Sequence, residues 1–231
     1  HRQLTAAKKA ASRFNEAGST SEDHAYAKRK QIILTDGVKQ SGETLVIPAY
    51  SESGDITTIQ TIDQDGQKKF LPGGKIGGSF HFIGTEITSP TYITEGYATA
   101  ATLHQLTDKA VLVAFTANNL KAVAESMRKA SPRANFVIAA DNDVRPEGSN
   151  KPNAGIVHAQ AAAEAISAKM IYPQLASGSK CDFNDLYIAQ GSADTLKQIG
   201  HSVTNRQKTI EWISIDNMPE PEPLDFVIDD Y

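Results

Sequence analysis

The stretch TYITEGYATAATLHQLTDKAVLVAFT, residues 91–116, decides the fold class. An apolar run of strand length at 91–94 precedes an Ala-rich helical segment, and a second apolar run follows at 110–116. Toward the C-terminus the same alternation continues, with predicted helices at 118–130, 154–168 and from 182, and predicted strands at 135–140 and 169–173. Strands that alternate with helices of about 10–15 residues predict a mostly parallel sheet covered on both faces.

The sequence before residue 85 has a different character. Ala-rich and charged segments at 3–17 and 21–33 predict two helices, the second with Ser21 as its N-cap. Three β-rich stretches between residues 44 and 71, separated by the turn sequences SESG and QDGQ, predict a meander. A glycine-rich connection at 72–79 leads to a short strand at 80–84.

The predicted fold class is an α+β N-terminal subdomain followed by an α/β subdomain with a central, mostly parallel sheet. We place the N-terminal subdomain, helices followed by a meander, at residues 1–88 and the α/β subdomain at residues 89–200. Residues 201–231 are expected to form a helical or extended segment and an acidic tail, because residues 216–231 hold six acids and no Lys or Arg. A disordered linker and a short docking peptide around Leu224-Asp225-Phe226 both suit this tail.

Composition and motif content exclude several classes. The single cysteine, Cys181, excludes a disulfide framework and a cysteine-based zinc ribbon. No apolar run approaches the roughly 18 residues needed to span a bilayer, and no signal-peptide pattern opens the chain, so we expect a cytoplasmic protein without a membrane partner. The glycine-rich segment is not followed by Gly-Lys-Ser/Thr, which excludes a Walker A loop and an ATP-driven helicase. Without the tail, 21 acids stand against 23 bases, so the rest of the chain is slightly basic.

Acidic residues follow two of the predicted strands of the α/β subdomain. Glu95 follows the strand at 91–94, and Asp141 and Asp143 follow the strand at 135–140. The carboxyl ends of parallel strands form the ligand crevice of an open α/β sheet, and residues i and i+2 of an extended segment point to the same side. Three converging carboxylates favour a hard cation such as Mg²⁺ or Mn²⁺. The alternative is a helix cap at Glu95 and a solvated turn at Asp141 and Asp143.

A second acidic cluster, Asp182-Phe183-Asn184-Asp185, opens the last predicted helix. Residues i and i+3 share a helix face, so both carboxylates can reach the same crevice. Ordinary helix-start chemistry explains the same two acids without any ligand.

Basic residues gather at three places before residue 80. Lys28-Arg29-Lys30 ends the second predicted helix, Lys68-Lys69 lies on the meander, and Lys75 stands in the glycine-rich segment. All three places suit phosphate contacts to a nucleotide or a nucleic-acid strand. A solvated helix face or, for Lys75, a loose connection between strands explains the same residues without a ligand.

Seven motifs, taken in order, resemble those of the TOPRIM-containing primases of phages, plasmids and integrated elements. The resemblance covers residues 20–190, with Ala25 in place of the family's usual Pro. The segments that carry it are HAYAKRK (24–30), the meander with LVIP (45–48), QTI (60–62) and GQKKFLPGGK (66–75), TEGYATA (94–100), NL (119–120), ADND (140–143), NAG (153–155) and DFNDL (182–186).

The resemblance implies which residues form the site. Glu95, Asp141 and Asp143 match the TOPRIM acidic triad, as catalytic residues and metal ligands. Asp182 and Asp185 are similar to the further acids near the metals. The residues expected to contact nucleotide or template are Lys28, Arg29, Lys30, Lys69, Lys75 and Lys180.

The function implied is that of a DNA primase, a DNA-directed RNA polymerase and nucleotidyltransferase. It would synthesise short RNA primers from ribonucleoside triphosphates on a single-stranded DNA template, with Mg²⁺ or Mn²⁺ at the carboxylates. A replicative helicase, or further domains of the same polypeptide, would be its protein partner. The alternatives are a TOPRIM metal-dependent nuclease, which uses the same acids for phosphodiester hydrolysis, and a non-catalytic nucleic-acid-binding replication module.

Overall fold

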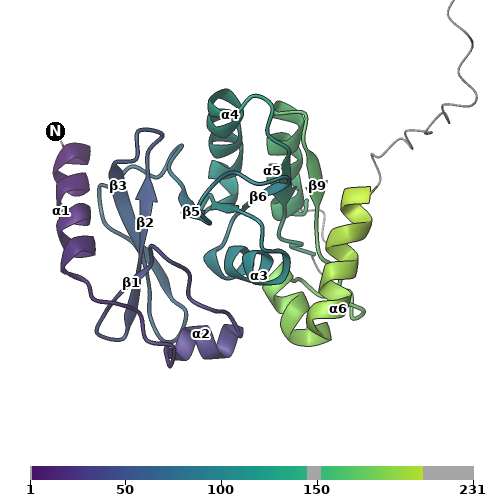
Figure 1. Cartoon of the computed structure of the whole chain (residues 1–231), viewed down its shortest axis with the longest axis horizontal. Coiled ribbons are helices and arrows are strands. Elements are labelled where there is room, and N and C mark those ends of the chain that lie inside the picture. Colours follow the sequence, from purple (N-terminus) through teal and green to yellow (C-terminus); the bar gives the residue numbers. More distant parts are fainter. Residues whose placement is uncertain (1, 145–151, 205–231) are drawn as a thin grey trace, which may run out of the picture.

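The computed structural model describes residues 2–144 and 152–204 (Figure 1), so the predicted acidic tail lies outside the described residues. The first half of the chain builds a helix, a short helix and a meander, followed by one further strand. These elements are α1 (Arg2–Glu16), α2 (Ala25–Lys30), β1 (Lys39–Ser41), β2 (Thr44–Tyr50), β3 (Ile56–Ile62), β4 (Lys68–Phe70) and β5 (His81–Ile83).

The second half alternates strands and helices, as predicted. Its elements are β6 (Thr91–Thr94), α3 (Tyr97–Thr107), β7 (Val111–Val113), the 3₁₀ turn η1 (Ala117–Asn119), α4 (Leu120–Ala130), β8 (Phe136–Ala139), α5 (Ala154–Ala165), β9 (Lys169–Ile171) and α6 (Phe183–Thr204). Within α6, Gly191 has a φ of 78° and a ψ of −180°, which breaks the helix into two segments.

The meander forms a four-stranded antiparallel sheet in the order β1-β2-β3-β4. Helix α1 covers one face of this sheet (Figure 1). Ala10 of α1 packs with Val46 of β2, Ile59 of β3 and Leu71, the residue after β4. Successive side chains of a strand point to opposite faces of the sheet, so the residues next to Val46 and Ile59 face away from α1 and toward the rest of the molecule.

The second sheet has five strands in the order β5-β7-β6-β8-β9. Strands β7, β6, β8 and β9 are parallel, and β5 pairs antiparallel with β7 at the edge. Helices α4 and α5 lie together on one face, and α3 and α6 lie together on the other (Figure 1). The predicted fold class is therefore confirmed, with a central, mostly parallel sheet in the second half of the chain.

One hydrophobic core joins the two sheets. Leu45, Ile47 and Ile62 from the meander are buried in the same cluster as Val111 and Val113 of β7. The intervening Leu112 points the other way, into the cluster beneath α4 and α5. Backbone hydrogen bonds between Tyr50 and Phe80, at 2.7 and 3.0 Å, add a bridge from β2 to the segment that leads into β5.

Two elements differ from the sequence-based expectation. The helix expected at 21–33 is confined to residues 25–30, because His24 caps its start by accepting a hydrogen bond from the Tyr26 N–H at 3.2 Å and Gln31 ends it in a left-handed conformation. Strand β5 precedes residue 88 but pairs within the parallel sheet rather than with the meander.

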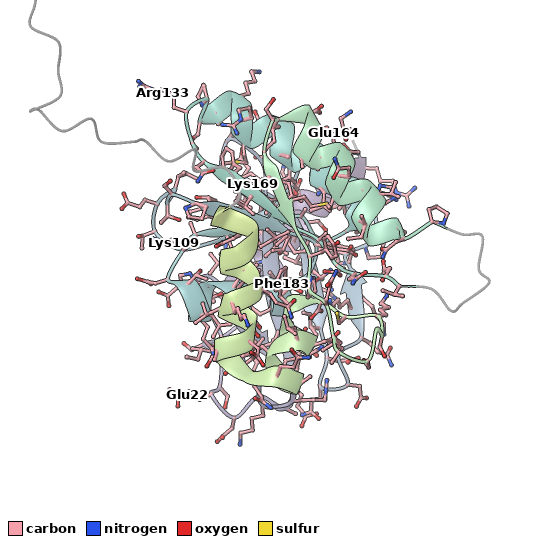
Figure 2. The ribbon with its side chains drawn as sticks, turned by 90° about the vertical axis from the view of Figure 1, so that its right-hand side faces the viewer. Glu22, Lys109, Arg133, Glu164, Lys169 and Phe183 are labelled. Atoms are coloured by element: carbon pink, nitrogen blue, oxygen red, sulfur yellow. The ribbon has the colours of Figure 1, made fainter. Side chains whose placement is uncertain are left out.

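No helix among residues 2–144 and 152–204 is both long and apolar enough to cross a membrane. Figure 2 looks onto α6, with Phe183 near the middle of the view and the charged residues Glu22, Arg133 and Glu164 at the periphery. Phe183 is fully buried. The first turn of α6 is thereby anchored in the core that both sheets share.

Candidate active site

A cavity of about 290 Å³ lies where the carboxyl ends of β6 and β8 approach β4 and α2. Its wall brings together acids and bases from five separate parts of the chain. The lining residues are Tyr26, Arg29, Lys30, Asp65, Gly66, Lys68, Glu95, Gly96, Ala98, Thr99, Asp141 and Asp182. Two larger hollows elsewhere, of about 650 and 720 Å³, contain none of the predicted site residues, and a third, of about 440 Å³, contains only Lys75 among them.

Glu95 leaves the end of β6, immediately before the N-cap of α3. Burial raises the pKa of its carboxyl group, and the nearby charge of Asp143 raises it further. The ammonium group of Lys68 and a hydrogen bond from the backbone of Ala117 act in the opposite direction, because both stabilise the ionised form. Glu95 is therefore a carboxylate held beside other acids, with two lysines, Lys68 and Lys180, close enough to stabilise its ionised form.

Asp141 follows β8 and is the most strongly perturbed acid of the cavity. Its pKa is raised to about 8, first by burial and then by the charges of Asp182, Glu95 and Asp143. Its Oδ1 atom is buried and has no hydrogen-bond partner among the described residues. A buried carboxylate oxygen surrounded by three other acids is unfavourable unless a proton or a cation neutralises it.

The loop that carries Asp141 and Asp143 is fixed from two sides. The backbone of Asn142 exchanges hydrogen bonds with that of Cys181, at 2.9 and 3.1 Å. The Asn153 side chain accepts from the Asp143 N–H at 3.0 Å, donates to Asn142 Oδ1 at 2.9 Å and caps α5 by accepting from the Ile156 N–H. Asn142 and Asn153 thus position the two aspartates. Their appearance in the ADND and NAG motifs was the available sequence signal.

The structure places the remaining predicted acids in three different settings. Asp143 forms an ion pair with Lys180, whose pKa is raised chiefly by that hydrogen bond, and Asp143 does not line the cavity itself. Asp182 lines the cavity and also forms a capping box with Asp185, with N–H to carboxylate distances of 2.8 and 3.2 Å. Asp185 additionally pairs with Lys30 at 3.2 Å.

The donor set fits a hard divalent cation. The acids of the cavity supply carboxylate oxygens, one of them buried without a partner, and burial together with the repulsion between these acids raises the pKa of Asp141. Across residues 2–144 and 152–204, no three His, Cys, Asp or Glu side chains already stand in a metal-ligating arrangement. Glu95, Asp141 and Asp182 line the cavity together, so they are the residues that would hold a cation there.

The predicted basic residues separate into cavity and surface groups. Arg29 and Lys30 line the cavity, and Arg29 also donates to the Gln64 carbonyl at 2.7 Å. Lys28 is exposed and pairs with Asp23 at 2.6 Å. Lys75 lines a different hollow, of about 440 Å³, beside α4. Lys69 lies on β4 but is not part of the cavity wall.

Lys68 is a cavity residue that the sequence-based assignment does not include, whereas the predicted Lys69 lies outside the cavity wall. In β4, Lys68 and Phe70 share a face, and Phe70 packs edge-on against Phe115 of the common core. Lys68 pairs in register with the buried Ile62. The alternation of the strand, counted from the apolar Phe70, was the signal that separates the two lysines.

Residues 91–193 match the family described as the Toprim domain. Two proteins called DNA primase TraC, both from Escherichia coli, are similar to this chain. One is 38% identical over 150 residues, covering 63% of this chain and 14% of the relative. The other is 34% identical over 167 residues, covering 70% and 12%. The chain therefore spans only about one seventh of the length of these relatives.

Solved primase structures share the fold. The primase fragment of the bacteriophage T7 primase-helicase protein matches with a TM-score of 0.54 and 15% identity, over 80% of this chain and 76% of that one. The DnaG primase catalytic domain bound to single-stranded DNA matches with a TM-score of 0.56 and 10% identity, over 87% and 80%. These structural matches confirm the fold, and the Toprim match together with the two TraC relatives confirms the resemblance to Toprim-containing primases that the ordered motifs predicted.

Proposed function

We propose that this chain, which carries a Toprim domain at residues 91–193, is the catalytic core of a DNA primase. The observation that carries the proposal is the convergence of Glu95, Asp141 and Asp182 with Lys30 and Lys68 in one cavity between the two sheets. Carboxylates that hold divalent cations, facing bases that attract phosphates, are the two requirements of metal-dependent nucleotidyl transfer.

The reaction would join ribonucleoside triphosphates into a short RNA primer on a single-stranded DNA template. A primer 3′-hydroxyl oxygen would attack the α-phosphorus, with pyrophosphate as the leaving group. The chemistry that a bound Mg²⁺ or Mn²⁺ supplies at such a site is a lower hydroxyl pKa and neutralisation of the charge on the phosphates. Asp141 and Asp182 would hold the cation, and Glu95 would complete its coordination or accept the hydroxyl proton.

The bases of the cavity would orient the substrate. Arg29 and Lys30 come from α2 and Lys68 comes from β4, so the N-terminal subdomain closes the cavity opposite the Toprim carboxylates. Phosphate oxygens held by these side chains would bring the α-phosphorus toward the acids.

We further propose single-stranded DNA, ribonucleoside triphosphates and a replicative helicase, or further domains of the same polypeptide, as the partners. We also propose that residues 1–88 and 89–200 form the two subdomains.

The test is primer synthesis from labelled ribonucleotides on single-stranded DNA with Mg²⁺ or Mn²⁺. The variants are Glu95→Gln and Asp141→Asn, matched by Glu125→Gln and Asp194→Asn, whose side chains are exposed. We expect products from the wild type and both controls and a loss of at least about a hundredfold in the two site variants. Equal yields from all five proteins would reject the assignment. Metal-dependent cleavage of DNA without triphosphates, and no primers, would identify a nuclease instead.

A further inference from the structure

The first turn of α3 forms an open recess in the wall of the cavity. Gly96 is the N-cap of α3, and no side chain among the described residues caps this end of the helix. The N–H groups of the first helical residues have no intrahelical partners, and the helix dipole adds partial positive charge there. Gly96, Ala98 and Thr99 line the cavity next to Glu95.

Thr99 supplies an independent sign that a ligand belongs in this recess. Its side chain is 1% exposed, it lines the cavity, and its Oγ1 atom has no hydrogen-bond partner among the described residues. Buried hydroxyl groups in folded proteins are almost always paired. A hydroxyl that faces a cavity without a partner is therefore available to donate to an acceptor that enters the cavity.

The space above Gly96 is bounded by donors. A Cβ atom placed on Gly96 would lie 3.5 Å from Lys68 Nζ and 3.8 Å from Thr99 Oγ1. The Lys68 ammonium group and the Thr99 hydroxyl group thus flank a space that is open because Gly96 has no side chain. Arg29 and Lys30 contribute further positive charge to the same cavity.

We infer that this recess binds a phosphate group of the substrate through the N–H groups of the first turn of α3, the Thr99 hydroxyl and the Lys68 ammonium. The inference rests on the proposed function, and it assigns to this wall the phosphate oxygens that face away from Asp141 and Asp182. The phosphate belongs either to an incoming ribonucleoside triphosphate or to a nucleic-acid strand. Both present the same non-bridging oxygens, so the experiment separates the two sources.

Three substitutions test the recess without disturbing the fold. In Gly96→Ala the methyl group fills the recess, and the φ of −102° at this position suits any residue. Thr99→Val keeps the shape of the side chain and removes the hydroxyl. Lys68→Met removes the charge. The matched controls are Gly18→Ala, whose Cβ would only touch the Gln40 carbonyl at 3.9 Å, and Lys129→Met at an exposed position.

Binding is measured by calorimetric titration with three probes, each in the presence of Mg²⁺: inorganic tripolyphosphate, ATP and a short single-stranded DNA oligonucleotide. Thermal unfolding of each variant is recorded alongside. We expect Gly96→Ala, Thr99→Val and Lys68→Met each to weaken binding about tenfold. Loss with tripolyphosphate and ATP assigns the recess to the triphosphate, and loss with the oligonucleotide alone assigns it to the strand.

Thr99→Val carries a signature that a merely structural residue would not show. Because the hydroxyl is unpaired in the free protein, its removal should leave the unfolding temperature unchanged or raise it while phosphate affinity falls. Wild-type affinity for all three probes in Gly96→Ala and Thr99→Val, or a wild type that binds none of them, overturns the inference. Weakened tripolyphosphate binding in a protein that makes no primers would retain the phosphate recess and reject the primase proposal instead.

Discussion

Gly155, in the first turn of α5, lies directly against the backbone of Asp141. A Cβ atom on Gly155 would overlap the Asp141 carbonyl oxygen and stand 3.2 Å from Asp143 Oδ2. The carbonyl is part of the backbone, so no flexible side chain can move aside to relieve the overlap. The close approach of α5 to the loop therefore fixes where both aspartates lie, and it requires glycine.

Gly155→Ala should consequently damage the site although it adds only one methyl group. Alanine favours helices over glycine, yet we expect the free energy of unfolding to fall by about 1–3 kcal/mol because of the overlap. We also expect Mg²⁺ to protect the variant from thermal unfolding less than it protects the wild type. Urea denaturation and thermal melts with and without Mg²⁺ measure both effects. A variant as stable as the wild type, with undiminished protection by Mg²⁺, would disprove this role of Gly155.

The raised pKa of Asp141 makes the stability of the metal-free protein depend on pH. The carboxyl group has a pKa of about 8 in the folded chain and an ordinary value near 3.8 in the unfolded chain. The folded state binds more protons between these values, so the contribution of Asp141 to stability is lost as pH rises from about 4 to about 8. In the presence of a chelator at pH 8, Asp141→Asn should therefore have an unfolding temperature several degrees higher than that of the wild type. At pH 4 the two proteins should unfold at the same temperature.

The same titration predicts competition between protons and the cation. Mg²⁺ binding to the wild type should strengthen as pH rises toward 8, because the cation takes the place of the proton on Asp141. Thermal shift measurements at several Mg²⁺ concentrations, at pH 6 and pH 8, test this with Asp194→Asn as the control. A protection by Mg²⁺ that is equal at both pH values, or that persists in Asp141→Asn, would rule the explanation out.

His81 has the opposite pH dependence and acts at a different place. It is 1% exposed, lies between the rings of Tyr50 and Tyr97, and has Nδ1 3.2 Å from the Pro48 carbonyl. Burial lowers its pKa from 6.5 to about 4. The unfolded chain binds the proton more readily, so stability should be lost as pH falls from 6.5 to 4, by up to about 3 kcal/mol.

His81→Phe keeps a ring in this position and removes the titration. Urea denaturation at pH 7 and pH 4.5 measures the free energy of unfolding of His81→Phe and of the wild type. Relative to the wild type, the variant should be more stable at pH 4.5 than at pH 7. Taking the difference at each pH removes the contribution of the carboxylates, which is common to both proteins. An unchanged difference would show that His81 does not titrate as described.

Asn184 and Asp185 both connect α2 to α6, but we expect them to contribute unequally to the free energy of unfolding. The buried Asn184 side chain donates to the Lys30 carbonyl at 2.6 Å and to Thr102 Oγ1 at 2.9 Å, which ties α2 and α3 to α6. The ion pair of Lys30 with Asp185 is partly exposed. We expect Asn184→Ala to lower the free energy of unfolding by about 1–3 kcal/mol and Asp185→Asn by less than about 1 kcal/mol. A larger effect from Asp185→Asn would reverse this interpretation.

Much of the fold was predictable because local chemistry and global fold agree. The uninterrupted apolar run of Val111, Leu112 and Val113, all fully buried, is typical of a parallel strand covered on both faces. The capping box of Asp182 and Asp185 was also visible in the sequence as helix-start chemistry. The position of Asp182 in the cavity required the tertiary structure, because a cap and a ligand have the same sequence pattern.

Other features depend on contacts between distant segments and were not predictable. Strand alternation counted from Phe70 places Lys68 and Lys69 on opposite faces, but which of these faces meets the cavity follows only from the packing of Phe70 against Phe115. The unpaired Thr99 hydroxyl is hidden in a helix whose pattern looks like ordinary core. Strand β5 joins the edge of the parallel sheet through β7, which no local pattern indicates.

A crystal of the protein grown with Mn²⁺ and examined by anomalous scattering tests the metal site at Asp141 most directly. We expect a peak in the cavity at coordinating distance, about 2–2.5 Å, from the Asp141 carboxylate, with Glu95 or Asp182 as a second ligand, and no such peak in Asp141→Asn. Manganese bound only at other places, or an empty cavity at Mn²⁺ concentrations that support primer synthesis, would contradict it.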